Sequence, residues 1–300
     1  MRAVTYHEYG EPSVLQVEEV PEPHAGPGQV RIRVEAASIN AVDWKFRAGY
    51  LQQMMPLQFP AIPGHDAAGV VDEVGDGVTE TTVGERVFGL AANGAAAEYA
   101  VLTAWAPIPA GWSAEQGAAA GVAGETAVRV LDELGVASGS TVLIEGAAGG
   151  VGSAAVQIAV ARGATVIGTA SEPNHEYLRS LGAIPTTYGP GLPERVAALA
   201  PDGVDAVFDV VGSGSLPDLI TIAPSPSQVV SIADPAATEQ GARLSGGSPA
   251  PAANLAKVAA AGAAGSYQPH IAASYRLEQL AEAHARSQQG HTQGKLVLTP

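Results

Sequence analysis

The sequence lacks cysteine altogether, and this absence excludes several chemistries at once. Without a thiol the chain can form no disulfide, no thiolate zinc site, no cysteine nucleophile and no iron–sulfur cluster. Positive charge is also scarce, because Lys plus Arg number 15 against 30 Asp plus Glu, which gives a formal net charge of −15. No basic block occurs, so we expect neither a nucleic-acid platform nor a binder of anionic membranes.

Long hydrophobic runs are missing as well. The N-terminal segment MRAVTYHEYG holds no apolar core of the kind that a secretory signal has. No uninterrupted apolar run reaches the roughly 18 residues that a membrane span needs. We therefore expect a soluble, cytoplasmic protein. The 300 residues are 46% hydrophobic and 15% charged, which suffices for a sizeable core in one large domain or two ordinary ones.

Residues 1–110 have the pattern of a β-rich domain. Short β-forming runs alternate with Pro and Gly, which is turn punctuation typical of barrels and other irregular β folds. The predicted strands are Ala3–Thr5, Leu15–Glu19, Gln29–Ala36, Gly69–Val74, Arg86–Gly89 and Glu98–Val101.

After this region, helices and strands alternate, which predicts a parallel sheet with right-handed crossovers. The predicted helices are Ser113–Gly135, Ser153–Arg162, Asn174–Leu181, Leu255–Ala263 and Leu277–Gln288. The predicted strands are Thr141–Glu145, Thr165–Thr169, Val204–Val211, Gln228–Ala233 and Lys295–Leu298. The segment Pro224–Pro251 is rich in Pro, Gly, Ser and Ala, and we predict a mobile loop around one strand.

The segment Val142–Gly152, VLIEGAAGGVG, is the strongest local signal. An apolar strand runs into glycines and then into a helix, which is the context of a dinucleotide fingerprint. The strict G-x-G-x-x-G is not met, whereas Gly146, Gly149 and Gly152 meet G-x-x-G-x-x-G. Such glycines let the backbone approach a pyrophosphate at the helix N-terminus. The alternative is a plain turn between a strand and a helix.

The next predicted strand ends without the carboxylate that chelates the ribose hydroxyls of NAD. Ser171 stands there instead, about 20 residues after the glycines, and Glu172 follows it. A small hydroxyl leaves room for a 2′-phosphate and favours NADPH over NADH. The alternative is that Ser171 only caps the following helix.

Several ordered motifs together resemble one family. They are AASINAVDWKFRAG (Ala36–Gly49), PAIPGHDAAGVVDEVG (Pro60–Gly75), VGERVFGL (Val83–Leu90), GAAGGVG (Gly146–Gly152), LRSLGA (Leu178–Ala183), DVVG (Asp209–Gly212) and HTQGKLVL (His291–Leu298). Over nearly its whole length the chain resembles the zinc-independent quinone oxidoreductases of the medium-chain dehydrogenase/reductase superfamily, the ζ-crystallin-like group.

The resemblance implies an α/β fold of two domains. A GroES-like β-barrel catalytic domain would comprise residues 1–117 and 267–300, and a Rossmann domain with a doubly wound parallel sheet would comprise residues 118–266. It further implies a homodimer and NADPH-dependent, zinc-independent hydride transfer to a small-molecule quinone or α,β-unsaturated carbonyl. The alternatives are an NADPH-binding protein without turnover, or a non-redox cyclase or isomerase that reuses the same fold.

The resemblance also implies which residues lie at the catalytic site. Relatives that use zinc hold it where this chain has Asn40, His65 and Val122, and only His65 could ligate, so we expect no metal and a hydrogen-bonded barrel histidine. The expected catalytic residues are Asn40, Lys45, Tyr50 and Thr126. Asn40 could donate a hydrogen bond to a substrate carbonyl, or it could only fix its own loop. Lys45 could stabilise an enolate, or it could be an exposed lysine without a catalytic role. Tyr50 could donate a proton, or it could only shape the pocket. Thr126 would lie near the nicotinamide ribose.

The expected cofactor-binding residues follow from the same resemblance. They are Gly146, Ala148, Gly149, Gly150, Val151, Gly152, Ser171, Tyr188, Val211, Ser231, Ile232 and Lys295. Tyr188 would approach the 2′-phosphate end of NADPH. Two differences from the family pattern weaken the expected preference for NADPH. Pro173 stands where many relatives have a phosphate-binding Lys, and Gln293 stands where many have Arg.

Overall fold

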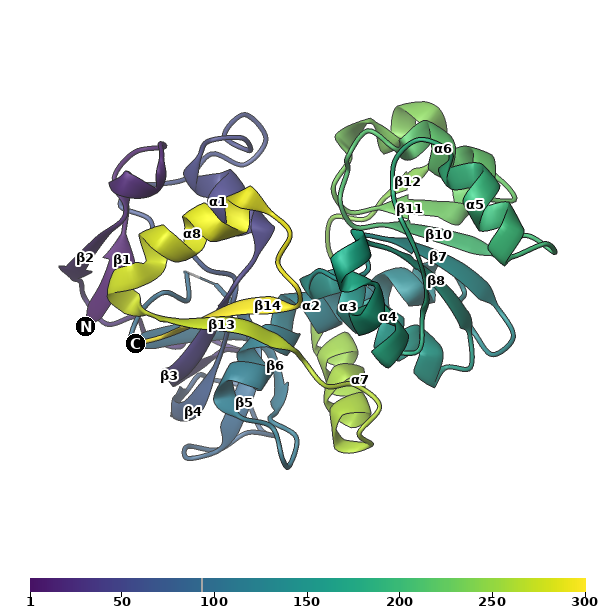
Figure 1. The fold of residues 1–300 in the computed structure, drawn as a ribbon. Helices are drawn as coiled ribbons and strands as arrows, with labels where there is room; N and C mark the ends of the chain where they lie inside the picture. The colour runs from purple at the N-terminus through teal and green to yellow at the C-terminus, as the bar shows by residue number, and fades with distance from the viewer. Residues whose placement is uncertain (93) are drawn as a thin grey trace. The chain divides into compact units, whose positions relative to one another are not determined.

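The computed structural model describes residues 1–92 and 94–300. The chain forms two compact units (Figure 1). The first unit contains Met1–Val122, Pro251–Ala263 and Pro269–Pro300, and the second contains Ala123–Ala250 and Ala264–Gln268. Helix α2 (Ala114–Glu133) begins in the first unit and ends in the second.

The first unit is built on an antiparallel barrel. Strands β3 (Val30–Ile39), β4 (Asp66–Val74), β5 (Arg86–Ala91) and β6 (Tyr99–Pro107) pair in sequence, and β6 pairs back onto β3. Glycines permit this closure, because a Cβ at Gly69 would stand 2.0 Å from the carbonyl oxygen of Arg33. Val30, Ile32 and Val34 alternate along β3 and point into the hydrophobic core of this unit.

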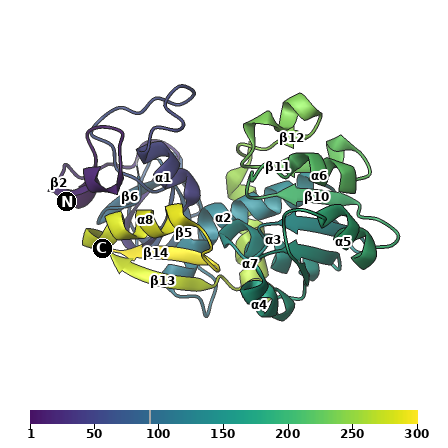
Figure 2. The same ribbon diagram turned by 45° about the horizontal axis from the view of Figure 1, so that its top comes forward.

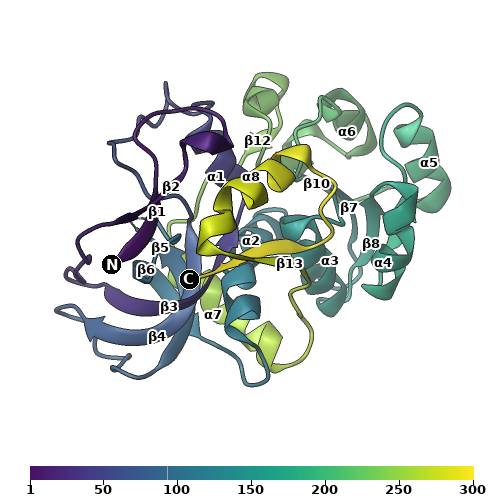
Figure 3. The same ribbon diagram turned by 60° about the vertical axis from the view of Figure 1, so that its left-hand side comes forward.

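Chain segments from both ends complete the first unit. Strand β14 (Lys295–Thr299) pairs with β3, and β13 (Ile271–Arg276) runs parallel beside β14 (Figure 2). Strands β1 (Arg2–Thr5) and β2 (Gln16–Glu19) form a separate two-stranded sheet. Helices α1 (Ala41–Arg47) and α8 (Leu280–Gln289) lie side by side (Figure 3). The short 3-10 helices η1 (Pro12–Val14) and η5 (Leu277–Gln279) lie next to these elements.

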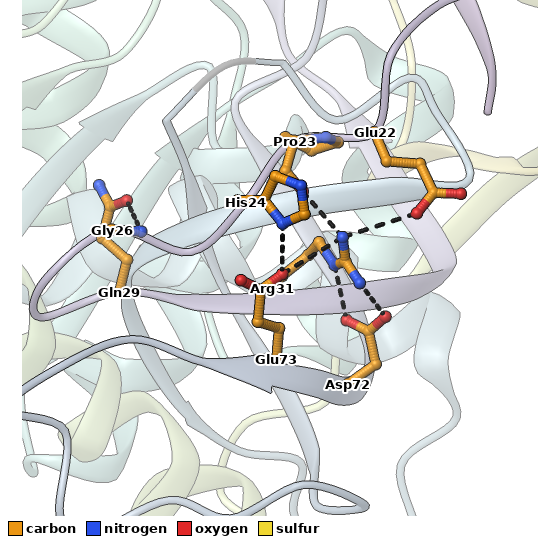
Figure 4. A network of polar contacts seen from close by, with 8 residues as sticks. All are labelled: Glu22, Pro23, His24, Gly26, Gln29, Arg31, Asp72 and Glu73. Atoms are coloured by element: carbon orange, nitrogen blue, oxygen red, sulfur yellow. Dashed lines mark hydrogen bonds and ion pairs between the residues drawn. The ribbon is translucent and has the colours of Figure 1, made fainter.

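Arg31 fastens the extended N-terminal segment to the barrel (Figure 4). Its guanidinium donates to both carboxylate oxygens of Asp72, at 3.1 and 2.9 Å, and to the carbonyl oxygen of Pro23 at 2.9 Å. Glu22 and Glu73 lie within 3.6 and 3.2 Å of the same guanidinium, and the ring of Tyr99 lies 5.0 Å away. This one side chain therefore connects β3, β4, β6 and the segment before β3.

Helix α7 (Pro251–Ala263) belongs to the first unit. A Cβ at Gly262 would stand 2.4 Å from the ring of Trp112, so the helix approaches this ring closely because Gly262 carries no side chain. The sequence resemblance predicted that this segment lies in the Rossmann domain. The difference arises because contact with a distant part of the chain, rather than chain order, decides where an amphipathic helix buries its apolar face.

The second unit is a six-stranded parallel sheet with helices between its strands. The order is β12 (Arg243–Leu244), β11 (Val229–Ser231), β10 (Ala206–Asp209), β7 (Thr141–Glu145), β8 (Thr165–Thr169) and β9 (Ile184–Thr186) (Figure 1). The helices are α3 (Gly150–Ala161), α4 (His175–Ser180), α5 (Leu192–Leu199) and α6 (Leu216–Ile222), and α5 packs against α6. Strand order therefore reverses between β7 and β10, as in doubly wound sheets.

The predicted two-domain α/β fold with a barrel and a doubly wound sheet is confirmed. The prediction for Pro224–Pro251 was wrong, because this segment contains η3 (Pro226–Gln228), η4 (Pro235–Gln240) and β12 besides the expected strand. Side chains hold these turns: Ser231 Oγ accepts from the amides of Ala233 and Asp234, and the Asp234 carboxylate accepts from the amide of Ala236. Composition carries no sign of such local hydrogen bonds.

Among the described residues, no helix has both the length and the apolar character that crossing a bilayer requires.

Candidate functional site

The turn between β7 and α3 uses its glycines in different ways. A Cβ at Gly152 would stand 2.2 Å from the carbonyl oxygen of Gly146, so this position packs the helix against the strand end. Gly146 adopts φ 74°, in the left-handed region that favours glycine. A Cβ at Gly149 would meet nothing closer than the carbonyl oxygen of Gly146 at 3.5 Å. The space beside the backbone is therefore free at Gly149 (open) and filled by neighbouring backbone atoms at Gly152 (closed).

The open face lies at the N-terminus of α3. Gly149 is the N-cap and has no side chain to bond the amides of the first helical turn, which begins at Gly150 and Val151. The turn itself is fixed to β8, because Thr169 accepts from the amides of Gly146 (3.1 Å, at Oγ1) and Ala147 (3.0 Å, at the carbonyl). Among the described residues no N-cap side chain bonds the first-turn amides, and such a fixed backbone at the positive end of a helix dipole fits the pyrophosphate of a dinucleotide.

Two buried carboxylates end the adjacent strands β7 and β10, where the strand order reverses. Glu145 and Asp209 are direct partners in the parallel ladder. Asp209 Oδ1 accepts from the amides of Val211 and Gly212, both at 2.9 Å. The Glu145 carboxylate accepts from the hydroxyl of Ser215 at 2.6 Å, and Ser213 donates to it at 3.2 Å. Together the two carboxylates fix the loop at 210–215 beside the glycine turn.

Burial raises the pKa of Glu145 to about 7, and the negative charge of Asp209 beside it acts in the same direction. The hydroxyls of Ser213 and Ser215 oppose this rise because they bond the ionised form. Sequence reasoning missed this pair. The available signal was a carboxylate at the last position of each of two apolar strands, but only the sheet order makes them neighbours.

The remaining expected cofactor residues of this unit lie on the same carboxyl edge of the sheet. Ser231 Oγ donates to Asp209 Oδ2 at 2.7 Å, and the amide of Ile232 donates to the Asp209 carbonyl at 3.1 Å. Val211 is 47% exposed, and its side chain covers the left-handed Gly146. Ser171 precedes η2 (Glu172–Asn174), and its hydroxyl accepts from the side-chain Nδ2 of Asn174 at 3.2 Å, while the backbone amide of Asn174 donates to the Ser171 carbonyl at 2.9 Å.

The first unit contains its own polar cluster around Asn40. Asn40 Nδ2 donates to Asp66 Oδ1 at 2.9 Å, while Asn40 Oδ1 accepts from Lys295 Nζ at 2.6 Å. Lys295 also donates to the carbonyl of Ile39 at 3.1 Å, and burial lowers the pKa of Lys295. Lys295 was predicted to bind the cofactor, and in the structure it is bonded to the expected catalytic residue Asn40. These bonds leave Asn40 with one amide hydrogen available.

A carboxylate–imidazole pair adjoins this cluster. His65 Nδ1 is hydrogen-bonded to Asp43 Oδ1, while Asp43 Oδ2 accepts from the amide of Asn40 at 2.7 Å. Burial acts to raise the pKa of Asp43, but the charge and hydrogen bond of His65 outweigh it and lower that pKa. Burial acts likewise to lower the pKa of His65, and the Asp43 carboxylate outweighs it and raises that pKa. The expectation of a hydrogen-bonded barrel histidine is thus confirmed, although the sequence did not reveal its partner.

Comparisons with known proteins decide the family. Residues 26–111 match the alcohol dehydrogenase GroES-like domain, and residues 191–298 match a family described as zinc-binding dehydrogenase. The chloroplast envelope quinone oxidoreductase homolog of Arabidopsis thaliana is 32% identical over 325 residues, covering 100% of this chain and 98% of that protein. The chain belongs to the quinone oxidoreductase family of the medium-chain dehydrogenase/reductase superfamily.

Other members of the family are similar in sequence and structure. The 2-methylene-furan-3-one reductase of Solanum lycopersicum is 37% identical over 230 residues, which cover 71% of this chain and 58% of that protein. The structure of mycobacterial Rv1454c complexed with NADPH is similar with a TM-score of 0.88 and 28% identity, and the match covers 100% of both chains. The fold and the family expected from the sequence motifs are therefore confirmed.

The three positions that the resemblance aligned with zinc ligands, Asn40, His65 and Val122, lie around one carboxylate. Asp66 bonds Asn40 through Oδ1 and accepts from the backbone amide of Val122 at 2.7 Å through Oδ2, and His65 precedes it in the chain. Of these side chains, an amide, an imidazole and an isopropyl group, only the imidazole is a usual zinc ligand. Within residues 1–92 and 94–300, no group of three His, Cys, Asp or Glu is arranged to hold a metal ion.

The other expected catalytic residues differ in their surroundings. Tyr50 is 69% exposed, and its ring stands edge-on to Trp44 with centroids 5.5 Å apart. Lys45 Nζ lies 5.9 Å from the same Trp44 ring. Thr126 is buried on α2 in the second unit, and its hydroxyl lies 3.5 Å from Arg129 Nη2. In the first unit, the structure thus bonds Asn40 to Lys295 and gathers Lys45 and Tyr50 around Trp44.

Proposed function

We propose that the protein is an NADPH-dependent, zinc-independent oxidoreductase that transfers hydride to a quinone or an α,β-unsaturated carbonyl compound. The observation that carries this proposal is the β7–α3 turn, which is open at Gly149 and closed at Gly152. The relatives support it, since one is named a quinone oxidoreductase homolog, one is named for reduction of a methylene-furanone, and one was solved with NADPH.

The chain's own residues would bind and orient. A nicotinamide cofactor, when bound, would supply the hydride for an electron-poor carbon. The amides of Gly150 and Val151 would hold the pyrophosphate against the helix N-terminus. Asn40 would donate its free amide hydrogen to the substrate carbonyl, and its orientation is fixed because Asp66 and Lys295 hold its other polar atoms. A preoriented donor stabilises the negative charge that develops on that oxygen.

The donor chemistry at Asn40 supports the proposed zinc independence. The ammonium of Lys295 lies 2.6 Å from Asn40 Oδ1, the one oxygen through which this amide could ligate. A divalent cation there would be repelled by the lysine. Besides His65, the usual zinc ligands nearby are Asp43 and Asp66, and all four of their carboxylate oxygens already accept hydrogen bonds. Elemental analysis of dialysed protein should therefore find no stoichiometric zinc, and one retained zinc per chain would contradict the proposal.

The Gly149→Val variant tests the cofactor assignment. Valine adopts the Gly149 backbone conformation, φ −76° and ψ −177°, without strain. Its side chain would stand where the phosphate must approach, so we expect NADPH affinity to fall by about a hundredfold or more, with the melting temperature nearly unchanged. Ala198→Val on the exposed face of α5 is a matched control that should bind as the wild type does. Unchanged affinity in Gly149→Val would refute the site.

Turnover is tested separately with 9,10-phenanthrenequinone and simple enones. NADPH oxidation with any of them supports hydride transfer. NADPH binding without oxidation of any compound would favour the binding-protein or non-redox alternatives. The homodimer and the cytoplasmic location remain predictions, which light scattering and cell fractionation test.

A further inference from the structure

We propose that Arg195 on α5 is the residue that adapts this chain to the 2′-phosphate of NADPH, because it shapes and charges the turn at 187–190. The inference rests on the proposed NADPH dependence. No Lys or Arg occurs between Arg179 and Arg195 in the chain, so Arg195 is the next cation after this turn.

The guanidinium of Arg195 is enclosed by backbone carbonyls. Nη1 donates to Pro190 at 2.8 Å, and Nη2 lies 3.0 Å from the carbonyl of Thr187, 3.2 Å from that of Gly189 and 3.3 Å from that of Tyr188. Four successive carbonyls thus turn toward one side chain. In a trans peptide the N–H points opposite to the preceding carbonyl, so the amides of Tyr188 and Gly189 point away from the guanidinium.

These outward amides are available to a ligand. Within the part of the chain that the structure describes, neither the Tyr188 amide nor the Gly189 amide has a hydrogen-bond acceptor. The Tyr188 side chain is 49% exposed on the same turn. Successive backbone N–H groups beside a hydroxyl form a concave donor set of the kind that binds phosphate oxygens.

Arg195 forms no ion pair among the described residues, although the Glu194 carboxylate is near: Arg195 Nη1 and Glu194 Oε2 stand 3.0 and 3.8 Å from where a Cβ at Gly191 would be. No Asp or Glu among the described residues lies within ion-pair distance of it, and Glu194 on the same helix is not its partner. The arginines of this unit that do pair with carboxylates are Arg129, Arg162 and Arg179. Carbonyl dipoles solvate the Arg195 cation but leave its net charge, which attracts an anion to the turn.

Strand register places this turn beside the ribose position. Thr169 of β8 pairs with Thr186 of β9, and the amide of Ala170 donates to the Thr186 carbonyl at 3.0 Å. Ser171 and Tyr188 each follow that pair by two residues, at the carboxyl ends of neighbouring strands. A phosphate on the ribose 2′-oxygen near Ser171 would therefore meet the turn that Arg195 holds.

The experiment measures dissociation constants of NADPH, NADH, adenosine 2′,5′-bisphosphate and 5′-AMP. For Arg195→Met we expect a loss of about tenfold to thirtyfold for the two ligands with a 2′-phosphate, and less than about twofold for the other two. Arg195→Lys should lose part of this affinity, because one ammonium keeps the charge but cannot bond four carbonyls. Arg179→Met, which removes an exposed arginine of the same unit, is the control and should bind as the wild type does.

The outcomes separate this inference from the proposed function. An equal loss for all four ligands, or no loss for any, in folded Arg195→Met would overturn the role of Arg195. If Arg195→Met does not fold, Arg195→Lys decides: selective loss of the ligands with a 2′-phosphate supports the inference, and unselective or absent loss refutes it. Wild-type protein that binds neither NADPH nor NADH would instead refute the proposed function.

Discussion

Replacing Glu145 by Gln should stabilise the protein at neutral and alkaline pH. In the wild type, Glu145 ionises beside Asp209 in a buried position at the ends of β7 and β10. Glutamine has the same shape as the protonated acid. Its oxygen can still accept from Ser215, which makes the shorter of the two serine hydrogen bonds to Glu145, and its amide hydrogens can donate to Asp209. The variant thus removes one of two neighbouring charges without leaving a cavity.

The magnitude follows from the pKa of Glu145, which burial raises from 4.5 to about 7 in the folded protein. Since the folded-state pKa is the higher one, the stability linked to this group is fully present below pH 4.5 and is lost as the pH rises to about 7. The loss is about 3 kcal/mol of unfolding free energy, at 1.36 kcal/mol for each pH unit between the two pKa values. Glutamine does not titrate, so Glu145→Gln avoids this loss.

Urea denaturation at pH 5 and pH 8, followed by fluorescence, measures the effect. We expect similar stability of both proteins at pH 5 and a gain of about 2 to 3 kcal/mol for Glu145→Gln at pH 8. Glu239→Gln, on the exposed surface of the same unit, controls for the loss of one negative charge from an acidic chain. If the variant is as stable as the wild type at pH 8, or less stable, then ionisation of Glu145 beside Asp209 does not destabilise the folded protein.

Three further predictions test other parts of the structure. Gly152→Ala should lower the melting temperature strongly, because its Cβ would stand 2.2 Å from the Gly146 carbonyl, while Gly149→Ala should leave it nearly unchanged; calorimetry compares the two. His284→Leu should reduce the loss of stability at acid pH. Burial lowers the pKa of His284 from 6.5 to about 4, so the wild type loses about 3 kcal/mol of unfolding free energy as the pH falls from 6.5 to about 4. An unchanged loss of stability at acid pH in urea titrations would refute this assignment. Ser171→Asp should weaken NADPH binding and favour NADH, because an acid repels the 2′-phosphate and bonds the ribose hydroxyls; titration of both cofactors would show no shift if Ser171 only caps its helix.

The sequence alone determined those features that are local in the chain. Strands β7 and β8 were predicted at their observed bounds, because short apolar runs end at glycine or at polar residues. The β7–α3 turn was recognisable for the same reason, since strand, glycines and helix follow one another within Val142–Gly152. The short helices α1, α5 and α6 were not predicted, because about two helical turns carry too little periodicity to stand out.

The tertiary structure decided which distant residues meet. Glu145 and Asp209 became neighbours only because β10 pairs with β7 instead of following β9 in the sheet. The bond from Lys295 to Asn40 required β14, at the end of the chain, to pair with β3. Arg195 bonds residues close in sequence, yet nothing in its neighbours predicted that four carbonyls would turn toward it. The hydrophobic pattern of a segment specifies which side of its strand or helix is buried. The partner of a side chain depends on strand order and on hydrogen bonds that form only in the assembled fold.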